Sequence, residues 1–173
     1  MVLENSTLEI GFNWSVEVIV ITLLTVVLVL GIIISFYSRW PANLSLLKYA
    51  LTIVILLIII VPAVYSPIRL SINDEKIVLK RLVGNIEIDL KNVYSVTIIS
   101  NREISNSIRT FGSGGLFGYL GQFKNNLIGS YTMYATEKQN LISINTSKGK
   151  YVFSCSKPHE FIELVNQKKK NVL

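Results

Sequence analysis

Two uncharged apolar runs fill most of the first third of the chain, Val18–Tyr37 and Tyr49–Tyr65. A helix of about 20 residues rises roughly 30 Å, which is the hydrocarbon thickness of a bilayer. The pattern therefore predicts two transmembrane helices, at about residues 16–38 and 47–66. Because only residues 38–48 connect the two runs, we expect the helices to form an antiparallel hairpin.

A cleaved signal peptide is the main alternative for the first run. Acidic residues precede it instead of positive charges, and it is longer than the roughly 7–15 apolar residues of a signal peptide. Residues 38–41 follow it and contain no small-residue cleavage motif. We therefore expect an uncleaved helix, with Tyr37 and Trp40 at the level of the lipid headgroups.

From Ile68 onward, apolar and polar residues alternate with a period of two, which is typical of half-buried β-strands. Turn-forming residues at 73–75 and 84–85 separate the first three of these segments, and residues 147–150 form the last turn. The pattern predicts seven strands, which lie at about residues 68–72, 76–80, 86–90, 93–99, 129–136, 141–145 and 151–155.

A helical period follows near the C-terminus. Ser156 is a suitable N-cap, Pro158 suits a first helical turn, and an apolar stripe occupies one face of residues 161–165. The pattern predicts an amphipathic helix at about residues 157–168, which ends in Lys168–Lys170. These lysines form either a solvated tail or a contact with anionic lipid.

The predicted elements divide the chain into two parts. Residues 1–66 hold an N-terminal tail and the two transmembrane helices, and residues 67–173 hold a β domain with the C-terminal helix. A domain of about 107 residues can form one hydrophobic core but not two. The order of elements favours an all-β fold, a bent barrel of about seven antiparallel strands capped by the helix.

The positive charge of the chain lies in the β domain. The net charge is +6, but residues 1–66 carry two basic and three acidic residues, so the remainder carries a net +7. A basic surface beside a bilayer attracts anionic lipid, with about 1 kcal/mol for each well-placed Lys or Arg. We therefore expect lipid contact and no nucleic-acid binding, because an anchor limits what the domain can reach.

Basic residues near the predicted helices favour a cytoplasmic β domain. Four of them lie within residues 67–81, just after the second helix, whereas the loop between the helices holds Arg39 and Lys48. Lys and Arg are enriched on the cytoplasmic side of membrane proteins. We therefore expect both termini and the β domain on that side.

Glycine and aromatic residues are concentrated in residues 109–123, RTFGSGGLFGYLGQF. A nucleotide-binding loop is excluded, because the glycine spacing is wrong, no helical pattern follows and no Gly-Lys-Ser/Thr occurs. Two interpretations remain: a hairpin or loop whose aromatic residues pack on the sheet, or a surface loop whose residues 116–120 enter the bilayer interface or contact a partner. The candidate contact residues are Arg109, Leu116, Phe117, Tyr119 and Lys124.

A broader pattern includes this segment and the residues that follow it. It consists of Arg109, Gly112, Gly114, Gly115, Leu116, Phe117, Gly118, Tyr119, Gly121, Phe123, Gly129, Tyr134, Ala135 and Thr136. This pattern resembles the bacterial PH domains, a prokaryotic membrane-anchored family of pleckstrin-homology-like domains, over about residues 68–166. The resemblance implies a seven-stranded bent barrel with a C-terminal helix, no activity, and a prokaryotic plasma membrane. The basic lipid-binding motif of the eukaryotic relatives is not recognisable, so phosphoinositide binding is not implied.

The inventory of reactive side chains is small. A single Cys155 allows no disulfide within the chain and, with the single His159, no Cys/His metal cluster. We expect Cys155 to be buried and inert, and expect solvated positions for His159 and for the carboxylate pairs Asp74-Glu75 and Glu87-Asp89. These residues predict no enzymatic activity, no catalytic residues, no cofactor and no metal.

The sequence therefore favours a binding or scaffolding role. A membrane-anchored PH-like module would contact anionic lipid or a protein partner at the membrane surface, and its partners would be the bilayer itself, another protein or a second copy of the chain. The alternative is an accessory subunit of a larger membrane complex, such as a transporter or an envelope-stress sensor. In that case the two helices themselves would form the interface.

Overall fold

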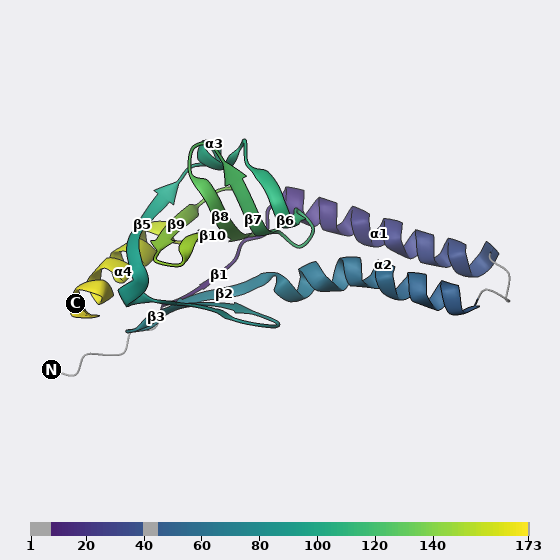
Figure 1. The fold of residues 1–173 in the computed structure, drawn as a ribbon, viewed down its shortest axis with the longest axis horizontal. Coiled ribbons are helices and arrows are strands. Elements are labelled where there is room, and N and C mark those ends of the chain that lie inside the picture. Colours follow the sequence, from purple (N-terminus) through teal and green to yellow (C-terminus); the bar gives the residue numbers. More distant parts are fainter. Residues whose placement is uncertain (1–7, 40–44, 173) are drawn as a thin grey trace.

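The computed structural model describes residues 8–39 and 45–172. Two long helices lie side by side and project from one end of a β domain that is built of two layers (Figure 1). A third long helix covers the opposite end of the domain, where the C-terminus also lies.

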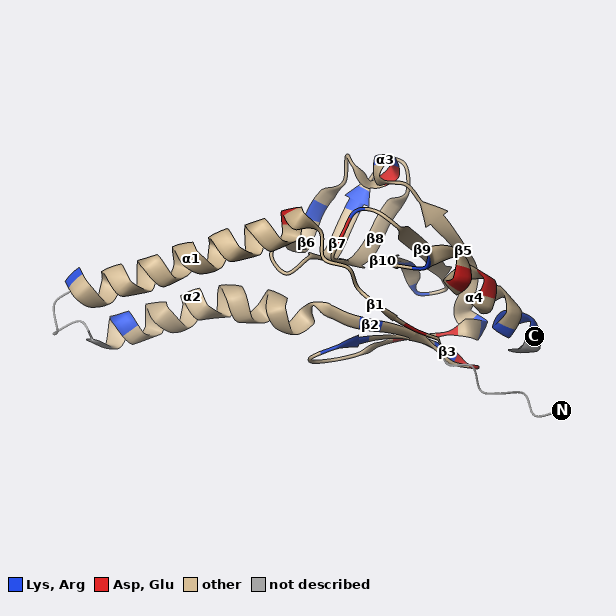
Figure 2. Ribbon diagram, turned by 180° about the vertical axis from the view of Figure 1, so that it is seen from behind, with Lys and Arg blue, Asp and Glu red and all other residues tan. Residues whose placement is uncertain are grey.

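The two projecting helices, α1 (Val16–Arg39) and α2 (Ser45–Tyr65), are the apolar helices that the sequence predicts. Both are long and apolar enough to cross a bilayer, and of the most apolar 18 residues of each, only 11% and 0% are buried. A core helix of a soluble protein would be mostly buried. Charged residues lie near the helix ends and are missing from the middle of each helix (Figure 2).

The first sheet contains four antiparallel strands in the order β1-β2-β3-β4. Their bounds are β1 (Leu8–Gly11), β2 (Pro67–Ile72), β3 (Lys76–Arg81) and β4 (Ile86–Asp89). β1 precedes α1 and β2 follows α2, yet the two strands pair, with Leu8 opposite Ile72 and Gly11 opposite Arg69. The tail before the first helix, for which the sequence predicted no strand, is thus part of this sheet.

The second sheet contains six strands in the order β5-β9-β10-β8-β7-β6. Their bounds are β5 (Val93–Ile99), β6 (Ile108–Gly114), β7 (Tyr119–Asn125), β8 (Gly129–Ala135), β9 (Leu141–Thr146) and β10 (Gly149–Ser154). A short turn η2 (Leu90–Asn92) leads into β5, and α3 (Asn101–Ile104) links β5 to β6. Neighbouring strands are antiparallel except β8 and β10, which pair in parallel.

The predicted β domain with a C-terminal helix is confirmed, but the predicted barrel of about seven antiparallel strands is not. The described residues form ten strands in two sheets that do not close, and one strand pair is parallel. β1 was missed because it has only four residues, and β6 and β7 because glycines interrupt their alternation. A parallel pair gives no local signal, since it joins strands that are not consecutive.

The helix α4 (Pro158–Val172) closes the domain at the end away from α1 and α2 (Figure 1). Its Phe161 and Val165 are buried in a cluster that also contains Leu70 and Phe153, one from each sheet. Burial of each such side chain stabilises a fold by about 1.5–3 kcal/mol. A second cluster includes Val18 from the first turn of α1, so this helix is packed into the second sheet at its base.

Candidate functional site

The glycine-rich segment forms the hairpin β6–β7, and its loop of residues 115–118 contacts the bases of both long helices. The Phe117 N–H donates a hydrogen bond to the Thr22 hydroxyl of α1 (3.0 Å). The Ser66 hydroxyl, just after α2, donates one to the Phe117 carbonyl (2.9 Å). The Phe117 ring also meets Trp14 edge to face, with 6.3 Å between the ring centroids. This loop therefore joins the β domain to the helical hairpin.

Backbone conformation explains the glycines of this loop. Gly115 and Gly118 have φ angles of +136° and +127°, which favour glycine because it lacks a Cβ. A Cβ at Gly115 would lie 2.8 Å from the Ile21 Cδ1, and one at Gly118 would lie 2.7 Å from the Ala135 carbonyl oxygen. Gly115 thus lets the loop approach α1 closely, and Gly118 lets it approach β8.

Tyr119 is one of the predicted contact residues, but it is only 6% exposed. Its hydroxyl donates a hydrogen bond to Glu17 of α1 (3.0 Å), and the Lys138 ammonium lies 4.6 Å from its ring centroid. Burial, followed by the contact with the Glu17 carboxylate, raises the pKa of Tyr119 to about 12. Tyr119 therefore belongs to the joint with α1, and the prediction that it is a surface contact is wrong.

The other four candidate residues do not form one surface. Arg109 and Lys124 are exposed on β6 and β7, whereas Leu116 and Phe117 are half-buried in the loop. Arg109 pairs with Phe123 across the two strands, so its side chain and that of Lys124 leave opposite faces of the sheet. The structure brings Leu116 and Phe117 together in the loop, and it brings Arg109 and Leu116 to the lining of one groove, whereas Lys124 lies apart from them.

A groove of about 950 Å³ lies between α2 and the strands β6, β7 and β8. Its helical wall is the end of α2 from Leu57 to Tyr65, and its other wall includes Phe111, Leu120 and Tyr134. Leu116 contributes to the lining as well. The volume is that of a site for a small molecule, and most of the lining is apolar.

Arg81, at the end of β3, also lines this groove, although the local sequence marks it only as a basic residue near a helix. Its Cζ lies 5.1 Å from the ring centroid of Tyr65 and 5.1 Å from that of Tyr134. Its Nε donates to the Gly84 carbonyl (2.6 Å), as does Nη2, and its Nη1 donates to the Tyr134 hydroxyl (3.1 Å). These partners come from α2, the following turn and β8, and no local pattern indicates that they meet.

A smaller hollow of about 500 Å³ lies on the other face of β7, where Tyr119 and Phe123 point. Its polar groups already bind one another: the Tyr131 hydroxyl donates to the Ser107 hydroxyl (2.7 Å), and Tyr119 binds Glu17. Burial raises the pKa of Tyr131 as well. The Tyr131 and Tyr119 hydroxyls beside this hollow are therefore already paired within the fold.

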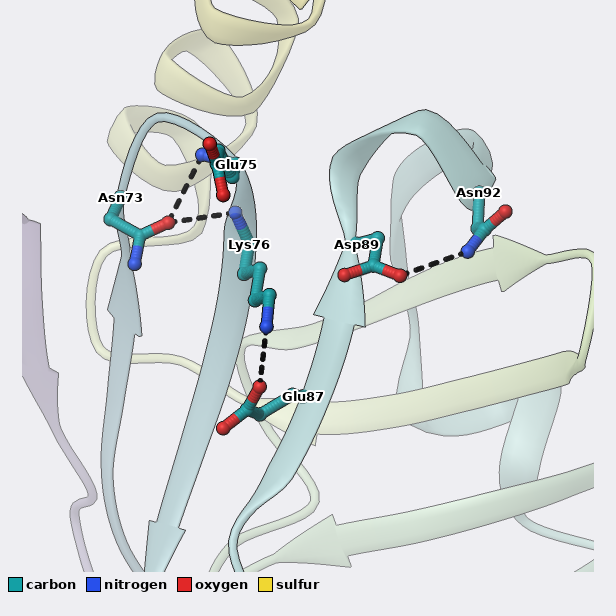
Figure 3. Close-up of polar contacts among 6 residues, drawn as sticks. All are labelled: Asn73, Glu75, Lys76, Glu87, Asp89 and Asn92. Carbon is teal, nitrogen blue, oxygen red and sulfur yellow. Dashed lines mark hydrogen bonds and ion pairs between the residues drawn. The ribbon is translucent and has the colours of Figure 1, made fainter.

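The carboxylates of the first sheet have structural partners (Figure 3). Glu87 accepts a hydrogen bond from the Lys76 ammonium (2.8 Å), and this contact raises the pKa of Lys76. Asp89 accepts one from the Asn92 amide (3.2 Å). Asn73 closes the β2–β3 turn, because its side-chain oxygen accepts the backbone N–H groups of residues 75 and 76.

The lysines at the end of α4 lie far from the helical hairpin (Figure 1). Lys168 is buried and pairs with Asp74 of the β2–β3 turn, and Lys169 donates to the Tyr94 carbonyl (3.0 Å). These contacts make Lys168 and Lys169 part of the folded domain. Their position does not favour the lipid contact that was one interpretation of Lys168–Lys170.

Cys155 and His159 lie at the start of the α4 region. Cys155 is buried, and burial raises the pKa of its thiol to about 11. His159 is exposed. Within residues 8–39 and 45–172, no three His, Cys, Asp or Glu side chains lie close enough to hold a metal ion.

We predict that Cys155 of the folded protein reacts slowly with a thiol reagent. At pH 8 a thiol of pKa 11 is ionised in about one molecule in a thousand, against about one in ten at the ordinary pKa of 9. The fold favours the neutral thiol of Cys155. The stabilisation that results from this preference is complete below pH 9, the ordinary pKa, and is lost as the pH rises to 11. Ellman's reagent should therefore react over hours in detergent solution and within minutes after urea is added. Complete reaction of the native protein within minutes would contradict the prediction.

Comparison with known proteins identifies the β part of the chain. A family model described as bacterial PH domain matches residues 68–169, which is more than half of the chain. The match extends from β2 into α4 and leaves out β1, α1 and α2. No match was found among curated proteins or among solved structures.

Proposed function

This chain belongs to the bacterial PH domain family, as the sequence resemblance indicated, and from this premise we propose that it is a membrane-anchored binding or scaffolding module without catalytic activity. Its helical hairpin spans the bilayer, and its β domain contacts anionic lipid or a protein partner at the membrane surface. PH-like domains are typically non-catalytic binding modules, which supports this role over an enzymatic one.

The strand pairing on either side of the helices carries the proposal. β1 and β2 are neighbours in one sheet. The N-terminal end of α1 and the C-terminal end of α2 therefore lie on the same side of any membrane. Only a few residues after Arg39 join the other two ends. Either both helices cross the bilayer or neither does. Their exposed apolar length of roughly 30 Å supports a crossing by both.

Aromatic side chains near both ends of the hairpin support the same arrangement. Trp14 and Tyr65 lie beside the β domain, and Tyr37 and Tyr49 lie toward the other end; all four are exposed. Trp and Tyr are enriched at the two interfaces of a bilayer, where their rings sit among the headgroups. Trp40, which the sequence also assigned to this level, lies outside the described residues.

The turn between β3 and β4 extends this membrane-facing end. Arg81 pairs with Pro67, which almost directly follows α2, so the turn after Arg81 lies beside the helices. Leu82 and Val83 of the turn are exposed, and Lys80 and Arg81 precede them. Exposed apolar residues next to basic ones are suited to contact with an anionic bilayer surface.

The distribution of basic residues supports a cytoplasmic position for the β domain, in a prokaryotic plasma membrane. Arg39 and Lys48 are the basic residues at the far end of the hairpin, and the β domain carries the larger basic excess. A topology reporter fused after Leu173 tests this side directly. A signal from the outer side of the membrane would reverse the assignment.

Membrane fractionation of the full-length chain tests the anchor. We expect the protein in the membrane pellet after washes with high salt and alkaline carbonate, and its release only by detergent. Arginine at the centre of a transmembrane helix costs about 2.5–3.5 kcal/mol, so a Leu28→Arg, Leu56→Arg variant should leave the pellet in large part. A Leu82→Arg, Val83→Arg variant is the matched control and should stay in it. Wild-type protein in a detergent-free supernatant would contradict the proposal.

The alternative role as an accessory subunit uses the same helices. The exposed apolar faces of α1 and α2 do not distinguish contact with a partner helix from contact with lipid, because lipid tails cover such faces equally well. Purification in mild detergent separates the two roles. A stable complex with other proteins would favour the accessory subunit, and a single chain would favour the independent module.

A further inference from the structure

The wall that α2 contributes to the groove runs along the membrane normal in the proposed arrangement. Leu57, Ile58, Val61 and Tyr65 lie on one side of the helix, at a spacing of about one turn. The distance from Tyr65 to Leu57 along the helix is about 12 Å, at roughly 1.5 Å per residue. The groove therefore extends from the headgroup level, beside Tyr65, to a depth at which acyl chains pack.

Arg81 lies at the headgroup end of this groove, and its guanidinium is held before any ligand arrives. Its contacts with the Tyr65 and Tyr134 rings fix the plane of the group, and its bonds to the Gly84 carbonyl fix one edge. Such stacking and fixed geometry reduce the entropy that a bound anion would otherwise cost. The side chain is thus ordered in a mostly apolar site without help from a ligand.

The charge of Arg81 is not neutralised by the chain. Among the described residues, no carboxylate lies within ion-pair distance of Arg81, whereas Arg69 pairs with Glu9 and Lys76 pairs with Glu87. A guanidinium has five N–H donors, and the contacts with Gly84 and Tyr134 use three of them. Two donors and a full positive charge remain for an acidic group.

We propose that the groove binds one acidic phospholipid of the bilayer. The phosphate of the headgroup accepts hydrogen bonds from the two remaining Arg81 donors, and one acyl chain lies against Leu57, Ile58 and Val61. This assignment rests on the proposed function, since the chain enters the groove from a membrane that α2 crosses. The groove combines the cations Arg81 and Arg109 with the apolar side chains of α2 and of the sheet, and this combination fits an acidic amphiphile better than a purely polar anion.

The apolar wall of the sheet completes the fit. Phe111 of β6 is 75% exposed, and Leu120 of β7 lies opposite Tyr134 of β8 on the same face. An aromatic side chain that stays exposed at a sheet edge is unfavourable in water but becomes buried once an acyl chain covers it. Binding of a lipid therefore removes from water an apolar surface that the fold itself leaves open.

Lipid titration of the full-length protein tests the proposal. The detergent-solubilised protein is titrated with phosphatidylglycerol, and bound lipid is counted by native mass spectrometry. We expect one retained phosphatidylglycerol, and an apparent affinity that falls at least about tenfold in Arg81→Gln, because the charged hydrogen bonds are lost. Lys148→Gln removes one positive charge from the exposed turn between β9 and β10, outside the lining of the groove, and should bind as the wild type does.

A second variant addresses the apolar half of the site. Ile58→Trp fills the groove beside α2 without touching the Arg81 contacts, and we expect it to lose the retained lipid while staying in the membrane pellet. This variant keeps the test decisive if Arg81→Gln proves unstable, because the two changes lie on different elements.

Several results would overturn the proposal. Equal binding by Arg81→Gln and Lys148→Gln, unchanged binding by Ile58→Trp, or equal retention of phosphatidylcholine would each do so. Displacement of the lipid by glycerol phosphate at equal concentration would show an anion site that needs no acyl chain. These results leave the membrane pellet unchanged, so they are distinct from a failure of the proposed anchor, in which the wild-type protein itself is found in the supernatant.

Discussion

A Gly112→Ala variant is expected to lose about 3–5 kcal/mol of the free energy of unfolding of the β domain. Gly112 of β6 lies opposite Gly121 of β7, and both have left-handed φ angles, +112° and +111°. A Cβ at Gly112 would lie 1.9 Å from the Leu120 carbonyl oxygen, a backbone atom that cannot rotate away. The variant therefore suffers both a strained φ and a clash that can be relieved only by separating the two strands.

Gly149→Ala is the matched control for this prediction. Gly149 has a φ of +133°, but no atom lies within 4 Å of a Cβ built there, so this variant suffers only the conformational cost of about 1–3 kcal/mol. Urea unfolding in detergent measures the stability of both variants, with the exposure of the Cys155 thiol as the probe of unfolding. If the two variants unfold at the same urea concentration, the close approach of β6 and β7 is not what makes Gly112 necessary.

Phe161→Ala is expected to cost a similar amount, about 3–5 kcal/mol. Phe161 is 1% exposed and packs in the cluster that holds Leu70 and Phe153, so its removal leaves a cavity between α4 and the sheets. Because α4 packs on both sheets, a shift of α4 into this cavity would also disturb its contacts with both layers.

His159→Ala lies in the same helix and serves as the control. His159 is exposed, and a surface substitution of this kind usually changes stability by no more than about 0.5 kcal/mol. Near-UV circular dichroism of the buried tyrosines provides a second measure of unfolding beside the thiol of Cys155. Equal stabilities of the Phe161 and His159 variants would mean that α4 is not part of the core of this domain.

Much of the fold was predictable because local periodicity reports burial. The spacing of apolar residues changes from one element to the next. It distinguishes the apolar helices, the strands from Ile68 to Ile99 and the apolar stripe of α4. The hairpin β6–β7 lacked that signal, since a glycine has no side chain to mark a face. The pairing of β1 with β2 was not predictable either, because it joins strands on opposite sides of two long helices.

The site was less predictable than the fold, for a physical reason that Tyr119 and Arg81 illustrate. A tyrosine in a glycine-rich segment without clear periodicity has the pattern of a loop residue, but Tyr119 is buried and its hydroxyl donates to Glu17 at the start of α1. Arg81 counted only as a basic residue near a helix. Its significance depends on Tyr65 and Tyr134, which reach it from other elements and enclose its charge in the groove.

The pairing of β1 with β2 also sets an order for biosynthesis. β1 leaves the ribosome first, but its partner strand emerges only after both apolar helices have been made. If the hairpin enters the bilayer during translation, β1 can pair with β2 only after both helices have been inserted. A chain with one helix inserted and the other left behind would hold β1 and β2 on opposite sides of the membrane. Completion of this sheet would then act as a checkpoint, so that only correctly inserted molecules acquire a folded domain.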